Sequence, residues 1–138
     1  MSRETIQAAH EFWERFSAGA ASGSADAGLA DPVLHPDVRY VEDPRWPGSG
    51  VYSGLEAIRA RFAEYLDIFG AIEVTLQETL DRGDLVVLVF VSRGESVQTG
   101  LPFEHEWAYL LTFRDGRIVE WRAYFEKAEA LEAVGLRA

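Results

Sequence analysis

The feature that most constrains the fold is a change in the spacing of apolar residues near Ile72. Before this point apolar residues recur every three to four positions, which is typical of helices. After it they alternate along Ile72, Val74 and Leu76, which is typical of strands. Helices followed by a run of strands predict an α+β fold rather than alternating βαβ units. We expect the helices to pack on one face of a curved antiparallel sheet.

Three helices are expected in the N-terminal half. The first spans about Ser2 to Ala18, and the Gly-, Ala- and Ser-rich stretch from Gly19 to Gly28 is expected to be a loop. A short second helix is predicted from Asp31-Pro32 to His35-Pro36-Asp37. Ser53 and Glu56 have the spacing of a capping box, which predicts a third helix that ends at Gly70.

The expected strands are short and follow one another closely. They cover Val38 to Asp43, Ile72 to Leu80, Leu85 to Arg93, Phe103 to Arg114 and Arg117 to Glu126. Asp115-Gly116 predicts a tight hairpin turn, because both residues tolerate positive φ. A short helix over Lys127 to Leu136 closes the chain.

Length and composition exclude several classes of function. The 138 residues are expected to form a single domain, 1–138. A formal charge of −10 would repel nucleic acid, and the absence of cysteine removes disulfides and thiolate chemistry. The apolar run Leu85 to Val91 is too short to span a membrane, and Met1 to Gln7 does not read as a signal peptide. We therefore expect a cytoplasmic protein without a nucleic-acid or membrane partner.

Short motifs along the chain resemble those of one family. They are His35-Pro36-Asp37-Val38, Val41-Glu42-Asp43-Pro44, Tyr52-Ser53-Gly54, Phe113-Arg114-Asp115-Gly116-Arg117-Ile118-Val119, and Ala128 to Leu136. In order and spacing these resemble the SnoaL-like branch of the nuclear-transport-factor-two-like superfamily, which also holds ketosteroid isomerases. The resemblance implies a cone in which a bent sheet and three helices enclose a mostly apolar cavity. It also implies a homodimer through the outer sheet face.

The resemblance suggests a catalytic carboxylate. Asp43 falls where ketosteroid isomerases carry the carboxylate that moves a proton, and an aspartate facing an apolar cavity becomes a better base. Asp before Pro is also a common turn initiator that bonds its own backbone, so a structural role stays open. The two oxyanion positions of those enzymes correspond to Phe16, which cannot donate a hydrogen bond, and Tyr109, which can.

Strand alternation groups the aromatic residues on one face. From Phe103 to Phe113 the odd positions, which include His105, Trp107 and Tyr109, are largely aromatic, whereas the even positions are more polar. His105 is a candidate proton donor, or alternatively a histidine bonded to a backbone carbonyl. Aromatic and apolar residues expected to bind substrate are Phe16, Tyr40, Trp46, Tyr52, Phe62, Leu88, Phe90, Trp107, Trp121 and Phe125. Any one of these residues could simply fill the core, but the set as a whole is better explained by a cavity, because a domain of this size has limited room to bury so many large rings.

The leading hypothesis is a cofactor-independent enzyme that performs isomerase- or cyclase-type proton transfer on a small apolar cyclic metabolite, such as a polyketide- or steroid-like compound. Asp43 would move the proton, and Tyr109 and His105 would polarise the reacting oxygen. The alternatives are a non-catalytic hydrophobic-ligand-binding dimer, a dimerising scaffold with a filled interior, and a dehydratase or epoxide hydrolase. The three histidines lack chelating spacing, so no metal site is expected.

Overall fold

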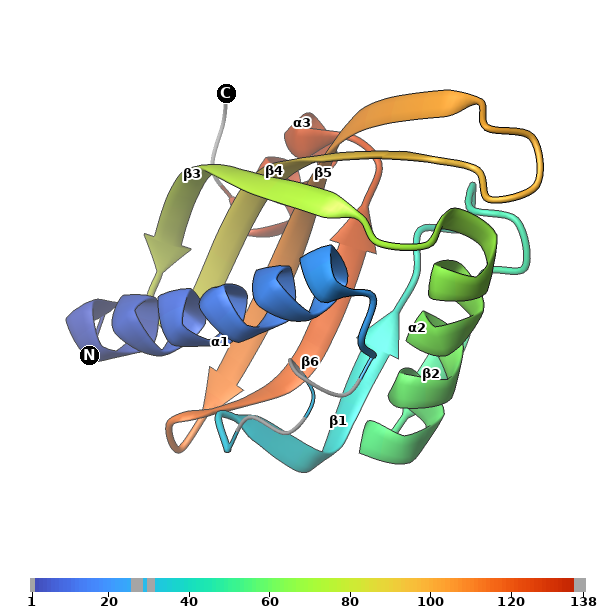
Figure 1. The fold of residues 1–138 in the computed structure, drawn as a ribbon. Coiled ribbons are helices and arrows are strands. Elements are labelled where there is room, and N and C mark those ends of the chain that lie inside the picture. The colour runs from blue at the N-terminus through green and yellow to red at the C-terminus, as the bar shows by residue number, and fades with distance from the viewer. Residues whose placement is uncertain (1, 26–28, 30–31, 136–138) are drawn as a thin grey trace.

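The structure, a computed structural model, describes residues 2–25, 29 and 32–135. The elements are α1 (Ser2–Ser22), β1 (Leu34–Val41), β2 (Val51–Ser53), α2 (Leu55–Phe69), β3 (Glu73–Arg82), β4 (Leu85–Glu95), β5 (Pro102–Arg114), β6 (Arg117–Tyr124) and α3 (Lys127–Ala133). The predicted α+β class is confirmed, with helices before the main run of strands and a short helix after it (Figure 1).

The six strands form one sheet in the order β2-β1-β6-β5-β4-β3. Strands β3 to β6 are an antiparallel meander, but β1 pairs with β6 in parallel, so the sheet is mixed where an antiparallel one was expected. No hairpin links β1 to β6, and the long connection between them allows either direction. Register shifts in three strand pairs bend the sheet into its curved shape.

The described part of the expected short second helix, residues 32–37, is not helical. Pro32 and Val33 form a turn and β1 already begins at Leu34, whereas Asp31 lies outside the described residues. Leu34 and Val38 are both buried in the core, so packing against the sheet outweighs the local helix-start signal of the Asp-Pro pair.

Two further local predictions differ from the structure. Helix α1 continues through Gly19 to Ser22, into the segment expected to be a loop. The predicted capping box is also wrong, because Ser53 belongs to β2 and Gly54 occupies the N-cap position of α2 with φ of 88° and no side-chain cap bond. Ser53 instead pairs with Arg39 of β1.

The helices lie on opposite faces of the sheet. On the inner face, Phe12 and Trp13 of α1 and Ile58 of α2 join one apolar cluster with residues of the sheet, which include Leu88 of β4 and Trp121 of β6. On the outer face α3 covers a smaller apolar cluster that includes Val87, Val89, Ala108, Leu110 and Ala130. The inner layer therefore holds the main core, and the expectation that the helices pack on one face is met by α1 and α2 but not by α3 (Figure 1).

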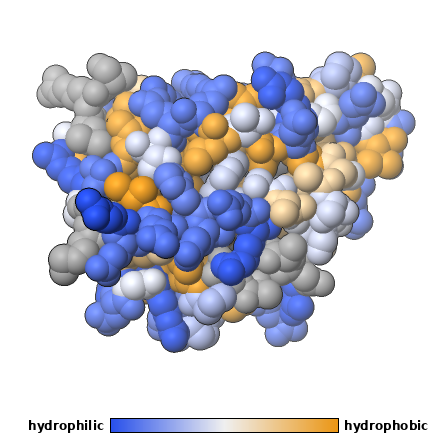
Figure 2. Space-filling view, turned by 60° about the vertical axis from the view of Figure 1, so that its left-hand side comes forward, coloured by the Kyte–Doolittle hydropathy of each residue, from blue (hydrophilic) through white to orange (hydrophobic). Residues whose placement is uncertain are grey.

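The predicted hairpin turn between β5 and β6 is present. Asp115 and Gly116 have φ of 51° and 78°, which fits the tight turn expected between β5 and β6. Hydrophilic side chains spread over the face shown in Figure 2, and the hydrophobic ones between them form separate areas. In the part of the chain that the structure describes, no helix has both the length and the apolar character needed to cross a bilayer.

Candidate functional site

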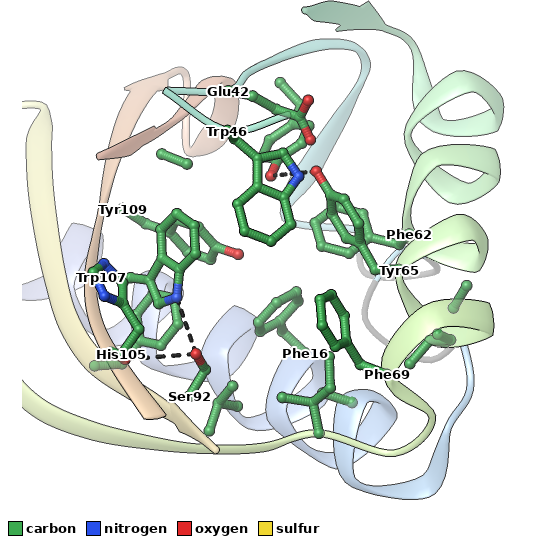
Figure 3. A pocket seen from close by; sticks show the side chains of 18 of the residues that line it. Phe16, Glu42, Trp46, Phe62, Tyr65, Phe69, Ser92, His105, Trp107 and Tyr109 are labelled. Atoms are coloured by element: carbon green, nitrogen blue, oxygen red, sulfur yellow. Dashed lines mark hydrogen bonds between the residues drawn. The ribbon is translucent and has the colours of Figure 1, made fainter. Parts of the chain in front are cut away.

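A cavity of about 370 Å³ lies between the inner face of the sheet and helices α1 and α2 (Figure 3). Strand alternation directs every second side chain of β4, β5 and β6 toward it. Most of its wall is aromatic or aliphatic. It is lined by Phe16, Ala20, Ser24, Ala25, Leu29, Tyr40, Glu42, Asp43, Trp46, Phe62, Tyr65, Leu66, Phe69, Ile72, Val74, Phe90, Ser92, Phe103, His105, Trp107, Tyr109, Ala123 and Phe125.

Most of the residues predicted to bind substrate reach this cavity. Those at its wall are Phe16, Tyr40, Trp46, Phe62, Phe90, Trp107 and Phe125. Trp121 and Leu88 face the same side of the sheet but are fully buried in the core behind the wall. Tyr52 lies outside the cavity, where its ring packs against Tyr40 and the guanidinium of Arg61. Sequence alternation gives the face of a residue, but it does not give depth along the sheet.

Tyr109 is the polar group best placed to meet a ligand. It lies on β5, buried among the rings of Phe16, Phe90 and Trp121, and Figure 3 shows its hydroxyl directed into the cavity. No other described residue hydrogen-bonds this hydroxyl. Burial, with a smaller contribution from the negative charge of Glu42, raises the pKa of Tyr109 far above its ordinary value. The phenol therefore stays protonated and can donate a hydrogen bond.

Asp43 reaches the cavity wall, but its carboxylate is already satisfied. The backbone N–H of Arg45 donates to Oδ1 at 2.9 Å, and the guanidinium of Arg45 donates to Oδ1 at 2.9 Å and to Oδ2 at 2.7 Å. The backbone N–H of Phe125 donates to Oδ2 at 2.9 Å. These bonds, led by that of the Arg45 side chain, hold the pKa of Asp43 well below its usual range despite its burial. In this arrangement Asp43 is a weak base.

His105, like Asp43, hydrogen-bonds the backbone of Phe125. Its Nε2 lies 3.2 Å from the carbonyl oxygen of Phe125, to which it donates. Its ring packs against Trp107 and Phe125 at centroid distances of 4.9 and 5.3 Å. The two side chains thus hold the N–H and the C=O of one residue, Phe125, whose ring forms part of the cavity wall. Both contacts match the structural alternatives considered for Asp43 and His105.

Glu42, Ser92 and Tyr65 are polar residues at the wall that were not singled out from the sequence. Glu42 is buried and accepts hydrogen bonds from Nε and a terminal nitrogen of Arg61 at 2.9 and 3.0 Å. The hydroxyl of Ser92 accepts a bond from Nε1 of Trp107 at 2.9 Å. Tyr65 places its hydroxyl 3.5 Å from that of Tyr40. Glu42 directly precedes Asp43, and Ser92 continues the inward alternation of Leu88 and Phe90, so both carried a usable signal.

Trp46 lies at the rim of the cavity, on the loop between β1 and β2. Its ring contacts those of Tyr65, Trp107 and Phe125 at centroid distances of 5.9, 5.5 and 6.1 Å. Arg61 holds this loop from α2 through bonds to the carbonyl oxygens of Pro47 and Gly48. The same arginine therefore pairs with Glu42 and fixes the segment that carries Trp46.

The site does not resemble a metal centre. Across the described ranges, no group of three or more histidine, aspartate or glutamate side chains could hold a metal ion. The two carboxylates at the wall, Glu42 and Asp43, are each paired with an arginine. Among the described residues, what the cavity offers a ligand is aromatic surface, the hydroxyl of Tyr109 and a few further polar groups.

Known proteins share this architecture. The model of the SnoaL-like domain matches residues 9–121, and no curated protein matches the sequence. An NTF2-like protein from Anabaena variabilis is 25% identical, with 92% of each chain covered and a TM-score of 0.78. A protein with a ketosteroid isomerase-like fold from Catenulispora acidiphila, solved with trimethylamine, is 22% identical over 91% of this chain and 93% of that one, with a TM-score of 0.72. TerC, co-crystallised with polyporic acid, is 21% identical over 95% and 97%, also with a TM-score of 0.72.

Proposed function

The chain belongs to the SnoaL-like domain family, and from this premise we propose that its cavity binds an uncharged, largely apolar small molecule with a ring system. The observation that carries the proposal is the wall of the cavity, which is mostly aromatic and whose two carboxylates are neutralised by Arg45 and Arg61. Among the described residues of this wall, a charged ligand would find no free counter-charge to replace its lost hydration, which is costly in an apolar site.

Tyr109 gives this binding its polar anchor. Its buried, protonated hydroxyl is suited to donate a hydrogen bond to a carbonyl or hydroxyl oxygen of the ligand. The rings of Phe16, Trp107 and Phe125 would hold the rest of the ligand by edge-to-face and offset contacts. A volume of about 370 Å³ lies near the lower end of ordinary ligand pockets, which supports a compact ring compound.

The similar structures support a small-molecule ligand in general. TerC was crystallised with polyporic acid, so a protein of this fold can take up a small organic compound. The choice of an uncharged ligand for the present chain rests on its own residues, above all on the two arginine–carboxylate pairs.

A second candidate function is cofactor-independent proton transfer on the same ligand, of the isomerase or cyclase type. The observation that favours it is the position of Asp43 at the cavity wall, next to an arginine whose side chain is 45% exposed. Asp43 would take a proton from a carbon beside a carbonyl, Tyr109 would stabilise the resulting enolate oxygen, and the proton would return to another carbon. This requires Arg45 to leave Asp43, because the ion pair weakens the base.

The dehydratase or epoxide-hydrolase alternative has less support. It would use a second acid or base facing Asp43 across the cavity. Glu42 is the other carboxylate at the wall, but Arg61 binds both of its oxygens. His105 has its Nε2 engaged by the carbonyl of Phe125.

One experiment with 1-tetralone, an uncharged two-ring ketone, tests the proposal and separates the two functions. Binding is measured by thermal shift in D₂O, and exchange of the protons beside the carbonyl is followed by NMR with the wild type and Asp43→Asn. A ligand at about 100 times its Kd stabilises the folded state by about 2.7 kcal/mol, so we expect a higher Tm and no exchange above the buffer rate. Exchange that the wild type accelerates and the Asp43→Asn variant does not would establish proton transfer instead. Failure of 1-tetralone and related uncharged ring compounds to raise the Tm would contradict the proposal.

A further inference from the structure

Gly94 and Phe103 face each other where β4 and β5 leave the cavity. They are directly opposite in the antiparallel register, so their side-chain positions share one face of the sheet. The ring of Phe103 lines the cavity and lies 4.8 Å, centroid to centroid, from that of Phe69, the last residue of α2. The two rings therefore connect the β4–β5 hairpin with α2 at this end of the cavity.

Substitution of Gly94 is limited by the neighbouring side chain rather than by backbone conformation. It is not among the glycines with positive φ, so any residue could adopt its backbone geometry. A Cβ placed on Gly94, however, would lie 2.9 Å from both Cε2 and Cζ of Phe103. The far edge of the Phe103 ring thus occupies the volume that a side chain at position 94 would need.

We propose that the pair Gly94–Phe103 determines the size of ligand that the cavity admits. The inference rests on the proposed function and deepens it, because it assigns the cavity to a flat compound that is longer than two fused rings, such as one with an additional linked ring. A side chain at position 94 would push the Phe103 ring away from β4, toward Phe69 and the cavity. The glycine keeps this ring against the sheet and leaves the end of the cavity open for the distal part of a longer ligand.

A double-mutant cycle with two uncharged probes tests the assignment. The probes are N-phenyl-1-naphthylamine, followed by its fluorescence, and the smaller 1-tetralone, followed by calorimetry. We expect Gly94→Ala to weaken binding of N-phenyl-1-naphthylamine about tenfold, because over-packing forces the ring inward, and to change binding of 1-tetralone by no more than about twofold. In a Phe103→Ala background the Gly94→Ala change should have no effect, since the displaced ring is gone. Leu101→Ala, an exposed position on the same hairpin, is the matched control and should bind as the wild type does.

Two results would contradict the proposal that the Gly94–Phe103 pair limits ligand size. One is an equal loss of affinity for both probes, and the other is the same loss of affinity from Gly94→Ala with and without Phe103. If the wild type binds neither probe, the proposed function fails. Acrylamide quenching of tryptophan fluorescence then tests separately whether the Gly94–Phe103 pair controls access to the cavity. Trp13 and Trp121 are buried, so quenching reports mainly on Trp46 and Trp107 at the cavity wall. Gly94→Ala should lower the quenching of these two tryptophans, and Phe103→Ala should raise it. Unchanged quenching in both variants would contradict the proposed role of the pair.

Discussion

At the scale of single residues, Asp43 decides between binding and catalysis. Burial raises the pKa of a carboxyl, whereas hydrogen bonds to its ionised form lower it. Here the bonds from the Arg45 side chain and from two backbone N–H groups outweigh burial, and the pKa lies well below its ordinary value. A carboxylate held in this way stabilises the structure around Phe125 more than it serves as a base.

This balance predicts how stability depends on pH. The folded-state pKa of Asp43 is below its unfolded value of about 3.9, so its contribution is present above that value and is lost as the pH falls. We expect Asp43→Asn to lower the free energy of unfolding by about 2 kcal/mol at pH 7, and the difference from the wild type to shrink below about pH 5. Urea unfolding at several pH values measures this. A difference that stays constant down to about pH 3 would contradict the assigned ion pair.

At the scale of elements, strong periodicity predicted the structure where it was present. Alternation from Phe103 to Phe113 placed β5 correctly, because Tyr109 and Leu111 are buried on one face, whereas β4 was predicted from the turn residues Asp81 to Asp84 and the apolar run that follows them. The Asp-Pro signal near Pro32 and the capping box at Ser53 failed, because pairing of β1 with β6 and of β2 with β1 overrode them.

The same reasoning explains what could be predicted of the candidate site. Alternation placed Tyr109 and Trp107 on the inner face, where both line the cavity. It could not show that Arg45 folds back onto Asp43 or that Arg61 reaches Glu42 from α2, since these contacts depend on loop conformation and on helix packing. The Glu42–Arg61 pair joins residues 19 positions apart, and no local sequence pattern predicts it.

At the scale of the whole molecule, the outer sheet face bears on the homodimer that the family resemblance implies. Helix α3 covers its apolar cluster, and ion pairs such as Arg39–Glu120, Arg93–Glu104 and Lys127–Glu78 lie on the rest of it. Arg82 also fixes α3 by donating to the carbonyl oxygens of Val134 and Gly135. A dimer through this face would therefore bury a polar surface, unlike the apolar interfaces of obligate dimers.

We accordingly expect a homodimer that dissociates on dilution. Sedimentation equilibrium should give a molar mass that falls toward the 15.4 kDa of one chain as the concentration is lowered through the micromolar range. The dissociation constant of the dimer should also depend on salt concentration, because salt screens exposed ion pairs. A mass of two chains that persists at nanomolar concentration would show that the interface lies elsewhere or that α3 moves aside.

The central claim is that Tyr109 donates a hydrogen bond to an uncharged ring compound in the aromatic cavity. The most direct test compares 1-tetralone with tetralin, which has the same rings without the carbonyl, by calorimetry on the wild type and Tyr109→Phe. We predict that the wild type binds 1-tetralone more tightly than tetralin by about 1 kcal/mol, roughly fivefold in Kd, and that Tyr109→Phe removes this preference while binding of tetralin is kept. An equal preference for the ketone in both proteins would contradict the account.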